Sequence, residues 1–160
     1  MRLGRTRVLW ILGLVAAIAA VVWLLRPAPA AQEGIAASLA EFQRALAEGQ
    51  NNDALDIVSR SFQGDGYTRG DAARGLLSLR RTWGSVRLNI ANLEVYPDPG
   101  GATAVALIDF SLSGVTPAGT ARSIGEREPL RVSTTWAREG RTWRCVGLSA
   151  LPNPVYESFW

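Results

Sequence analysis

The sequence predicts an α+β protein. We expect an N-terminal transmembrane helix, followed by three helices packed on a bent four-stranded antiparallel sheet that forms a cone-shaped α+β barrel. Three observations predict this class. Residues 8–25 form an uncharged apolar run that is long enough to cross a membrane as a helix. Residues 32–83 carry apolar side chains at helical spacing, and residues 86–151 show the alternation that is typical of strands. Helices followed by a run of strands indicate a helical layer on one face of an antiparallel sheet.

The start of the chain divides into a cytoplasmic tail, a signal anchor and a linker, over residues 1–7, 8–25 and 26–31. Trp10 and Trp23 lie near the two ends of the apolar run, where indole rings favour the membrane interface. Three arginines precede the run and one follows it, so the N-terminus is expected in the cytoplasm. The chain would then be a single-pass protein of the inner (cytoplasmic) membrane with a periplasmic domain. A cleavable signal peptide is the alternative, since Ala28-Pro29-Ala30 resembles a cleavage site.

Three helices are expected after the linker. The first covers residues 32–49 and carries one apolar stripe, formed by Ile35, Leu39, Phe42 and Leu46. Ser38 lies off this stripe. A short second helix is expected over Asp53–Ser61. The third should begin at Thr68, because Asp71 three residues later resembles a capping box. It should end at Gly84, since glycine is the usual residue just past a helix.

Four strands complete the predicted domain, over Val86–Tyr96, Ala102–Val115, Glu128–Glu139 and Thr142–Leu151. In the first strand the apolar residues change phase between Ile90 and Leu93, which indicates a β-bulge. The second strand is apolar on both faces and is expected at the centre of the sheet. Residues 115–125 are rich in Gly, Pro, Thr and Ser and are expected to form a loop. Residues 152–160 form a C-terminal tail that could fold back over the open end of the cone or contact a partner.

Composition excludes several kinds of chemistry. All 17 basic residues are Arg, and the chain contains neither Lys nor His. A Ser-His-Asp triad, a His-ligated zinc site and a Schiff-base lysine are therefore excluded, and we expect no cofactor and no metal. The single cysteine, Cys145, is expected to be a small buried apolar residue. Residues 31–160 hold all fourteen acids and thirteen of the arginines, so their net charge is about −1. We expect no binding to nucleic acid, because that requires a concentrated positive surface.

These elements, with Tyr67 before the third helix and the hairpin Val132–Arg144 (VSTTWAREGRTWR), are similar to the nuclear transport factor 2-like superfamily. This is the SnoaL-like, cystatin-like cone fold. The resemblance covers about residues 31–151, and we assign the domain to residues 32–151. It implies a cone with an apolar mouth and a homodimer formed through the sheet. Members include isomerases, dehydratases, cyclases and many non-enzymatic binding domains. The dehydratase-type members use His with Asp, so that activity is not expected here.

Asp109 is the weak candidate for a catalytic residue. It lies in the most apolar strand, and an apolar cavity would raise the pKa of its carboxyl and make it a base. Its alternation with Phe110 predicts the outer face of the sheet instead. Four aromatic residues could line a ligand pocket, although aromatic residues also fill such cores: Tyr67, Trp83, Trp136 and Trp143.

The sequence favours a membrane-anchored, extracytoplasmic, non-enzymatic domain in a cell-envelope complex. Such a domain would dock a partner protein or bind a small apolar ligand. The alternative is a small isomerase- or cyclase-like enzyme that acts on an apolar substrate in the cone, with Asp109 or Tyr67 at the reacting centre. An inward carboxylate in an open cavity would favour the enzyme. A cone filled by Trp and Leu side chains would favour docking.

Overall fold

The computed structural model describes residues 30–150. The predicted anchor at residues 8–25 and the tail at residues 152–160 lie outside the described residues, so both stay predictions. Among the described helices, none has the length and apolar character needed to cross a lipid bilayer.

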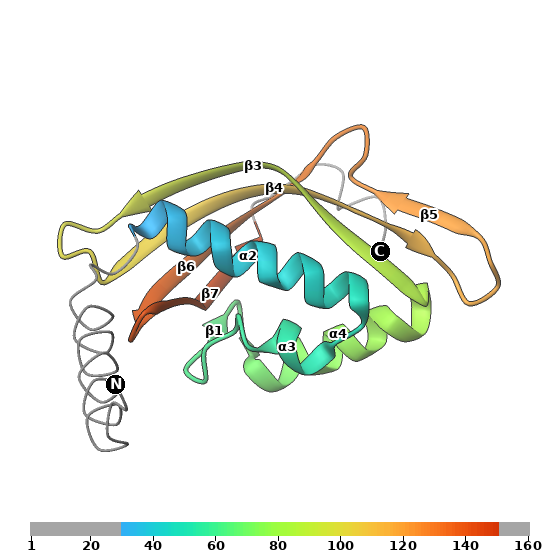
Figure 1. Cartoon of the computed structure of the whole chain (residues 1–160), viewed down its shortest axis with the longest axis horizontal. Coiled ribbons are helices and arrows are strands. Elements are labelled where there is room, and N and C mark those ends of the chain that lie inside the picture. The colour runs from blue at the N-terminus through green and yellow to red at the C-terminus, as the bar shows by residue number, and fades with distance from the viewer. Residues whose placement is uncertain (1–29, 151–160) are drawn as a thin grey trace, which may run out of the picture.

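A five-stranded antiparallel sheet dominates the described part of the chain (Figure 1). Its strands are β3 (Ser85–Pro97), β4 (Thr103–Val115), β5 (Ala121–Ile124), β6 (Leu130–Glu139) and β7 (Thr142–Ala150). The strand order is β3-β4-β6-β7, and β5 pairs with the end of β4 that β6 does not reach. Strand β4 is therefore central, as its apolar character on both faces predicts.

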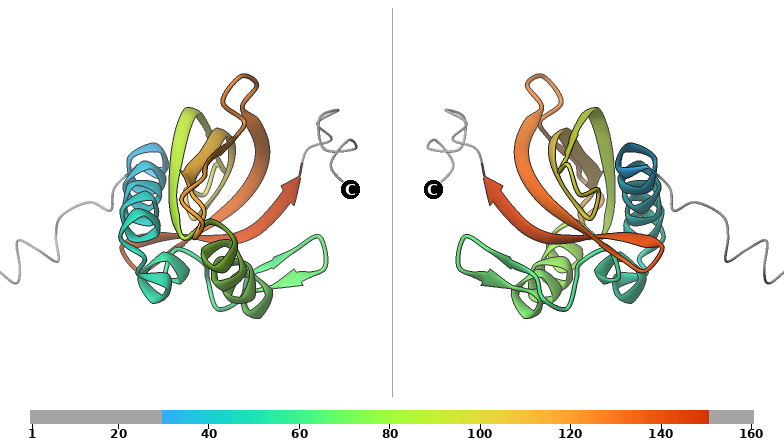
Figure 2. Two further views of the ribbon diagram at one scale, coloured as in Figure 1. Left: turned by 90° about the vertical axis from the view of Figure 1, so that its right-hand side faces the viewer. Right: turned by 90° about the vertical axis from the view of Figure 1, so that its left-hand side faces the viewer.

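The sheet is bent at a β-bulge in β3. The pairing of β3 with β4 shifts register between Ile90 and Asn92, which leaves Ala91 without a partner in β4. The phase change between Ile90 and Leu93 predicts a bulge at this place, and the prediction is confirmed. A second register shift lies at Thr135 and Trp136 in the pairing of β6 with β7. Bulges increase the local twist and bend the strand, and Figures 1 and 2 show the sheet curving over the helices.

The predicted four-stranded sheet is wrong in one respect. Residues 121–124, expected to be loop, form β5, and the next strand begins at Leu130 instead of Glu128. The side chains of β5 are all exposed, so they show no apolar alternation, and the strand is held by backbone pairing with β4. Strands β5 and β6 follow one another along the same edge of β4, and residues 125–129 protrude between them.

Three helices pack on one side of this sheet: α2 (Ala31–Glu48), α3 (Asn51–Leu55) and α4 (Arg69–Trp83). Helix α2 ends at Gly49, whose φ of 81° is left-handed backbone that glycine adopts readily. Helix α4 begins with the predicted capping box, in which Thr68 and Asp71 each bond the backbone N–H of the other. Helix α3 is shorter than the predicted Asp53–Ser61.

The residues after α3 pair with β7 instead of continuing the helix. The N–H of Ser59 donates to the carbonyl of Cys145 at 2.9 Å, and the N–H of Cys145 donates to the carbonyl of Ile57 at 2.8 Å. Two short strands follow, β1 (Gln63–Gly64) and β2 (Tyr67–Thr68), which form a small hairpin. The segment from residue 57 to residue 64 thus covers the outer edge of β7, which would otherwise present unpaired backbone groups.

The core consists of two clusters of buried side chains. The larger one lies between α2 and the sheet and contains Ile35, Leu39, Phe62, Ala104, Ala106, Ile108, Trp136, Trp143 and Cys145. The smaller one contains Leu46, Trp83 and Val86. Ser38 is also buried, although it lies off the predicted stripe of α2, because its hydroxyl donates to the carbonyl of Trp143 at 2.8 Å.

Candidate functional site

The interior of the curved sheet is filled by side chains. Trp136 and Trp143 are each 1% exposed and belong to the larger core cluster. The indole N–H of Trp136 donates to the hydroxyl of Thr134 at 2.8 Å, and that hydroxyl donates to the carbonyl of Ala106 at 3.0 Å. The indole N–H of Trp143 is buried against Gly34 and has no hydrogen-bond partner among the described residues. These two of the four aromatic residues predicted to line a pocket therefore belong to the larger core cluster.

The other two aromatic residues lie in different places. Trp83 is 5% exposed in the smaller cluster, and the guanidinium of Arg122 lies 5.9 Å from the centre of its ring. Tyr67 is 62% exposed, so it does not line an interior pocket. It was one of the aromatic residues expected to line a pocket, but it lies in the hairpin of β1 and β2, at the surface. The structure brings only Trp136 and Trp143 together.

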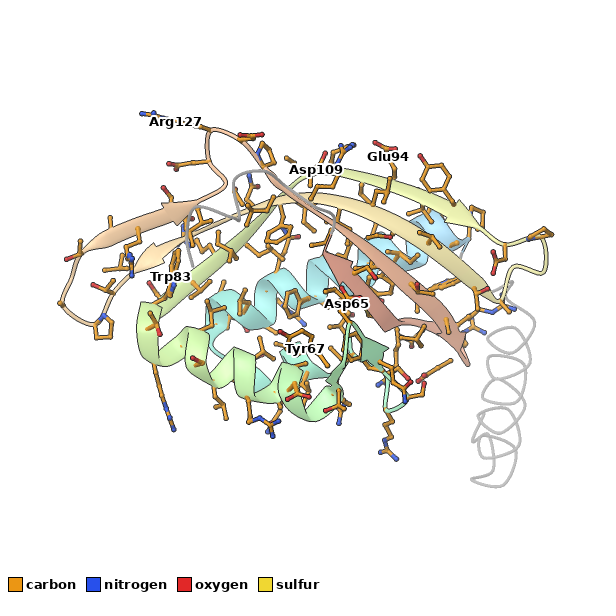
Figure 3. All side chains as sticks on the ribbon, turned by 180° about the vertical axis from the view of Figure 1, so that it is seen from behind. Asp65, Tyr67, Trp83, Glu94, Asp109 and Arg127 are labelled. Atoms are coloured by element: carbon orange, nitrogen blue, oxygen red, sulfur yellow. The ribbon has the colours of Figure 1, made fainter. Side chains whose placement is uncertain are left out.

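Asp109 lies on the outer face of the sheet, away from the helices (Figure 3). Its two carboxylate oxygens accept hydrogen bonds from Nε and an Nη of Arg131, at 2.5 and 2.6 Å. The guanidinium holds the pKa of the Asp109 carboxyl below its usual value, whereas a catalytic base in an apolar cavity would have a raised pKa. The outward placement predicted from the alternation of β4 is confirmed, and Asp109 is a surface ion pair.

A polar network continues this outer face along β3. Glu94 accepts hydrogen bonds from the Tyr96 hydroxyl at 2.7 Å and from the Asn92 amide at 2.9 Å. These bonds lower the pKa of Glu94, and the Tyr96 pKa is raised because its hydroxyl donates to a carboxylate. Networks of this kind at the surface contribute little to stability. They keep the outer face polar and rich in charge.

Cys145 is not suited to nucleophilic chemistry. It is 7% exposed, and burial raises the pKa of its thiol to about 11. Its Sγ lies 3.2 Å from the carbonyl oxygen of Gly147 and donates to it. The thiol is therefore protonated at neutral pH, as in structural cysteines. Within residues 30–150, no group of three Cys, Asp or Glu side chains is placed to hold a metal ion.

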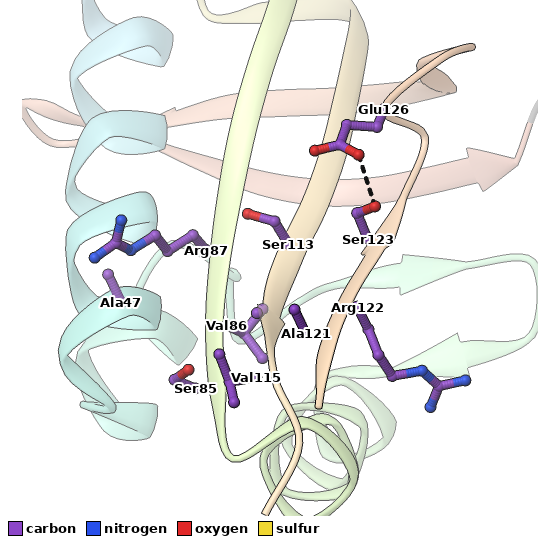
Figure 4. Close-up of a pocket in the computed structure, with 11 residues that line it drawn as sticks. Ala47, Ser85, Val86, Arg87, Ser113, Val115, Ala121, Arg122, Ser123 and Glu126 are labelled. Carbon is purple, nitrogen blue, oxygen red and sulfur yellow. Dashed lines mark hydrogen bonds between the residues drawn. The ribbon is translucent and has the colours of Figure 1, made fainter. Parts of the chain in front are cut away.

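An open groove of about 620 Å³ lies where β3, β4 and β5 pair (Figure 4). Most of its lining residues are small: Ala47, Ser85, Ser113, Gly114, Val115, Ala121 and Ser123. Arg87 and Arg122 stand on its two sides, and Glu126 comes from the segment that protrudes between β5 and β6. The Ser123 hydroxyl donates to Glu126 at 2.8 Å, which ties this segment to β5.

The register of the strands explains why the sheet surface is hollow here. Ser113 of β4 pairs with Arg87 of β3 and with Ser123 of β5. The short side chains of the two serines therefore lie side by side on the outer face, next to the long side chain of Arg87. Gly114 allows the strands to approach, since a Cβ at this position would lie 2.0 Å from the carbonyl oxygen of Ser85. The groove was not predicted from the sequence, because residues 115–125 were expected to form a loop. The available signal was the run of small residues at the end of the second predicted strand.

Solved structures provide the comparison. No family model matches the sequence, and no curated protein matches it. The chain is similar in structure to Aln2 from a Streptomyces species, with a TM-score of 0.65, 11% identity, and coverage of 82% of this chain and 97% of that one. It is similar to a protein of the nuclear transport factor 2-like superfamily from Salmonella enterica serovar Typhimurium, with a TM-score of 0.58, 15% identity, and coverage of 76% and 91%.

A third structure, Bd1075 from Bdellovibrio bacteriovorus, has a TM-score of 0.59 and 6% identity over 76% of this chain. The aligned part spans only 41% of the Bd1075 chain. At such low identities the likeness concerns the fold. The order of elements agrees with it, since helices α2 to α4 precede a curved antiparallel sheet. The chain therefore has the nuclear transport factor 2-like fold that its sequence resembles.

Proposed function

We propose that this chain is a membrane-anchored, extracytoplasmic, non-enzymatic domain that docks a partner protein in the cell envelope. Residues 8–25 would be the anchor, with the N-terminus in the cytoplasm and the folded domain on the periplasmic side. The apolar run and the arginines around it support this orientation. The docking surface would be the groove at the end of the sheet where β3, β4 and β5 meet, beside the end of α2.

One observation carries the proposal: among residues 30–150, the interior holds no group suited to acid–base or nucleophilic catalysis. The buried polar side chains among the described residues are Ser38, Ser59 and Thr134, and all three are hydroxyls. General acid–base catalysis requires a titratable group within reach of the substrate. A carboxylate on the inner face would favour an isomerase or a cyclase. Asp109, the candidate for that role, lies on the outer face and is paired with Arg131.

The groove suits a polypeptide better than a small apolar ligand. Its lining combines serine hydroxyls with the charges of Arg87, Arg122 and Glu126, and mixed polar surfaces are typical of protein–protein contacts. It also borders the start of β3, which is the edge strand of the sheet. An edge strand can accept an extended segment of a partner by backbone pairing. Both a second copy of the chain and another envelope protein would fit this description.

Site-specific photo-crosslinking in intact cells tests the proposal. A photoreactive residue at Ala121, on the rim of the groove, should give an adduct, whereas the same residue at Ser78 on the exposed surface of α4 should not. Adding Ser113→Arg should abolish the adduct, because the long side chain fills the groove floor. The mass of the adduct separates a homodimer from a different partner.

Fractionation tests the location independently. The chain should be in the membrane fraction, and protease added to the periplasmic side should degrade its folded domain. A cytosolic chain would contradict the proposed anchor. An adduct that persists in the Ser113→Arg variant, or no adduct from Ala121, would contradict the proposed docking surface.

A further inference from the structure

Positive charge gathers at one end of the domain. Residues 30–150 contain thirteen arginines and thirteen acidic residues, so this part of the chain is neutral as a whole. Ion pairs join Arg69, Arg74, Arg131 and Arg144 to carboxylates. None of these four arginines belongs to the groove where β3, β4 and β5 meet.

Four other arginines surround this groove: Arg44, Arg81, Arg87 and Arg122. Their side chains are exposed, and none of them forms an ion pair with a carboxylate of residues 30–150. Arg87 and Arg122 belong to the lining and lie on two opposite sides of the groove (Figure 4). The groove therefore presents positive charge that the fold itself does not pair.

Helix α2 brings Arg44 to the groove. Arg44 lies one turn before Ala47, which lines the groove, so the two side chains share one face of the helix. The amide of the neighbouring Gln43 donates to the carbonyl of Leu88 at 3.1 Å. This bond fixes the last turns of α2 beside β3, next to Arg87.

Helix α4 ends at the same place. Arg81 lies in its last turn, and Ser85 of the groove lining follows four residues later. The adjacent Arg80 has a different role, because its guanidinium donates to the carbonyls of Gly84 and Leu46 at 2.9 and 3.4 Å. These contacts offset the partial negative charge at the ends of α4 and α2, so Arg80 is not counted with the other four.

The nearby carboxylates offset only part of this charge. Glu126 is the acidic residue of the lining, and the Ser123 hydroxyl donates to its carboxylate at 2.8 Å. Glu48 lies at the end of α2. Arg127 and Glu128 follow on the protruding segment, where their charges cancel. The excess of arginine gives the groove a positive field, which attracts anionic groups.

Charge and position favour a different protein over two other occupants. A symmetric dimer built through this groove would place the same surface of both copies face to face, and arginines that meet across an interface weaken it. A lipid surface is disfavoured by distance. Helix α2 starts beside Ala30, where the described domain begins, and the groove lies at its far end. Its eighteen residues span about 27 Å.

We propose that the groove binds an acidic segment of a different protein, with Asp or Glu side chains opposite Arg87 and Arg122. The serine hydroxyls of the groove then donate hydrogen bonds to carbonyl or carboxylate oxygens of this segment. Complementary charge increases the association rate and rejects basic partners. The inference rests on the proposed docking function, because it gives the chemistry of the partner for the same groove.

Charge reversal combined with photo-crosslinking in intact cells tests the chemistry of the partner. The photoreactive residue stays at Ala121, and Arg87→Glu is combined with Arg122→Glu. We expect about tenfold less adduct, because each exposed charge pair changes the affinity a few-fold and reversal turns attraction into repulsion. Arg87→Lys with Arg122→Lys keeps the charge and should retain most of the adduct.

The matched control reverses two exposed arginines far from the groove, Arg60 and Arg138. The backbone N–H of Arg138 donates to the carbonyl of Ala102 just before β4, and Ser59 beside Arg60 donates to Glu139 at the end of β6. Both positions therefore lie at the opposite end of β4 from the groove. Arg60→Glu with Arg138→Glu changes the net charge equally and should leave the adduct unchanged.

Circular dichroism shows whether each variant folds. The guanidinium of Arg122 contacts the ring of Trp83, and if Arg122→Glu prevents folding, Arg44→Glu replaces it. An adduct that the double reversal leaves unchanged would overturn the acidic partner, while the docking groove would stand. An equal loss in the control variant would also overturn it, because the effect would belong to net charge.

Two results concern the partner itself. An adduct with the mass of two copies of the chain would overturn the inference and assign the groove to a second copy. No adduct from Ala121 in the parent chain would contradict the docking function, and the inference would fail with it.

Discussion

Gly34 allows α2 to pack directly on the indole ring of Trp143, so adding a single methyl group there should disrupt the contact. A Cβ at position 34 would lie 2.1 Å from Cδ1 and 2.7 Å from Nε1 of Trp143. Trp143 is 1% exposed and enclosed by the larger core cluster, so the ring has no space into which it can move. Relief therefore requires α2 to shift away from the sheet.

Two effects of Gly34→Ala have opposite signs. Replacing glycine by alanine within a helix stabilises it by about 1 kcal/mol, because alanine loses less backbone entropy on folding. Overpacking a filled core costs about 1–3 kcal/mol, and sometimes more. A contact near 2 Å against an enclosed ring belongs at the upper end of that range. We therefore expect Gly34→Ala to lower the free energy of unfolding by about 2 kcal/mol.

Gly75→Ala in α4 is the matched control. A Cβ at position 75 meets no atom within 4 Å, so only the helix preference remains and the variant should gain about 0.5–1 kcal/mol. Urea unfolding followed by tryptophan fluorescence measures both changes. Trp143→Phe in the Gly34→Ala background should recover part of the loss, because the smaller ring makes room for the methyl group. Equal stabilisation by the two alanine variants would refute the view that Gly34 is needed for this contact.

Three further changes test single contacts. Thr134→Val removes both hydrogen bonds of a buried hydroxyl and should cost about 1–3 kcal/mol in urea unfolding, whereas Thr135→Val at the exposed neighbour should be nearly neutral. Arg80→Met removes a guanidinium that donates to carbonyls at the ends of α2 and α4, and a loss of about 1 kcal/mol should lower the melting temperature in circular dichroism by about 4–8 °C. Asp109→Asn should weaken the dependence of the free energy of unfolding on acid pH. Arg131 lowers the pKa of Asp109 in the folded protein, so the ion pair stabilises the folded protein above the unfolded pKa of about 3.9. This stabilisation is lost as the pH falls through the folded pKa. An unchanged acid titration would contradict this role of the pair.

Features with a local physical cause were predictable from the sequence. The capping box at Thr68 and Asp71 involves residues three apart, so a short segment contains the whole signal. The bulge after Ile90 could be predicted because the apolar residues of the strand face the core on both sides of a change in their alternation. The outward position of Asp109 followed from alternation in the same way. Each of these predictions depended on a few neighbouring residues and one known face.

Features that depend on distant residues were not predictable. Ser38 is buried because its hydroxyl meets a carbonyl 105 residues later in the chain. The helix expected over Asp53–Ser61 is cut short because Ile57 and Ser59 pair with the backbone of Cys145. Strand β5 has only exposed side chains, so nothing in residues 121–124 indicates a strand until the end of β4 is known to lie beside them. The groove between β3, β4 and β5 was not predicted for the same reason.

The two faces of β4 differ in polarity and burial. Its inner residues, such as Ala106 and Ile108, are apolar and buried, whereas its outer residues, such as Asp109 and Ser113, are polar and more exposed. A polar ligand inside the fold would need unpaired groups that it could reach. The buried hydroxyl of Thr134 is already bonded, and the free indole N–H of Trp143 is enclosed by the core. Among the described residues, the polar groups that a ligand could reach therefore lie on the outer face, and we expect substitutions at Asp109 and Ser113 to change the free energy of unfolding less than substitutions at Ala106 and Ile108.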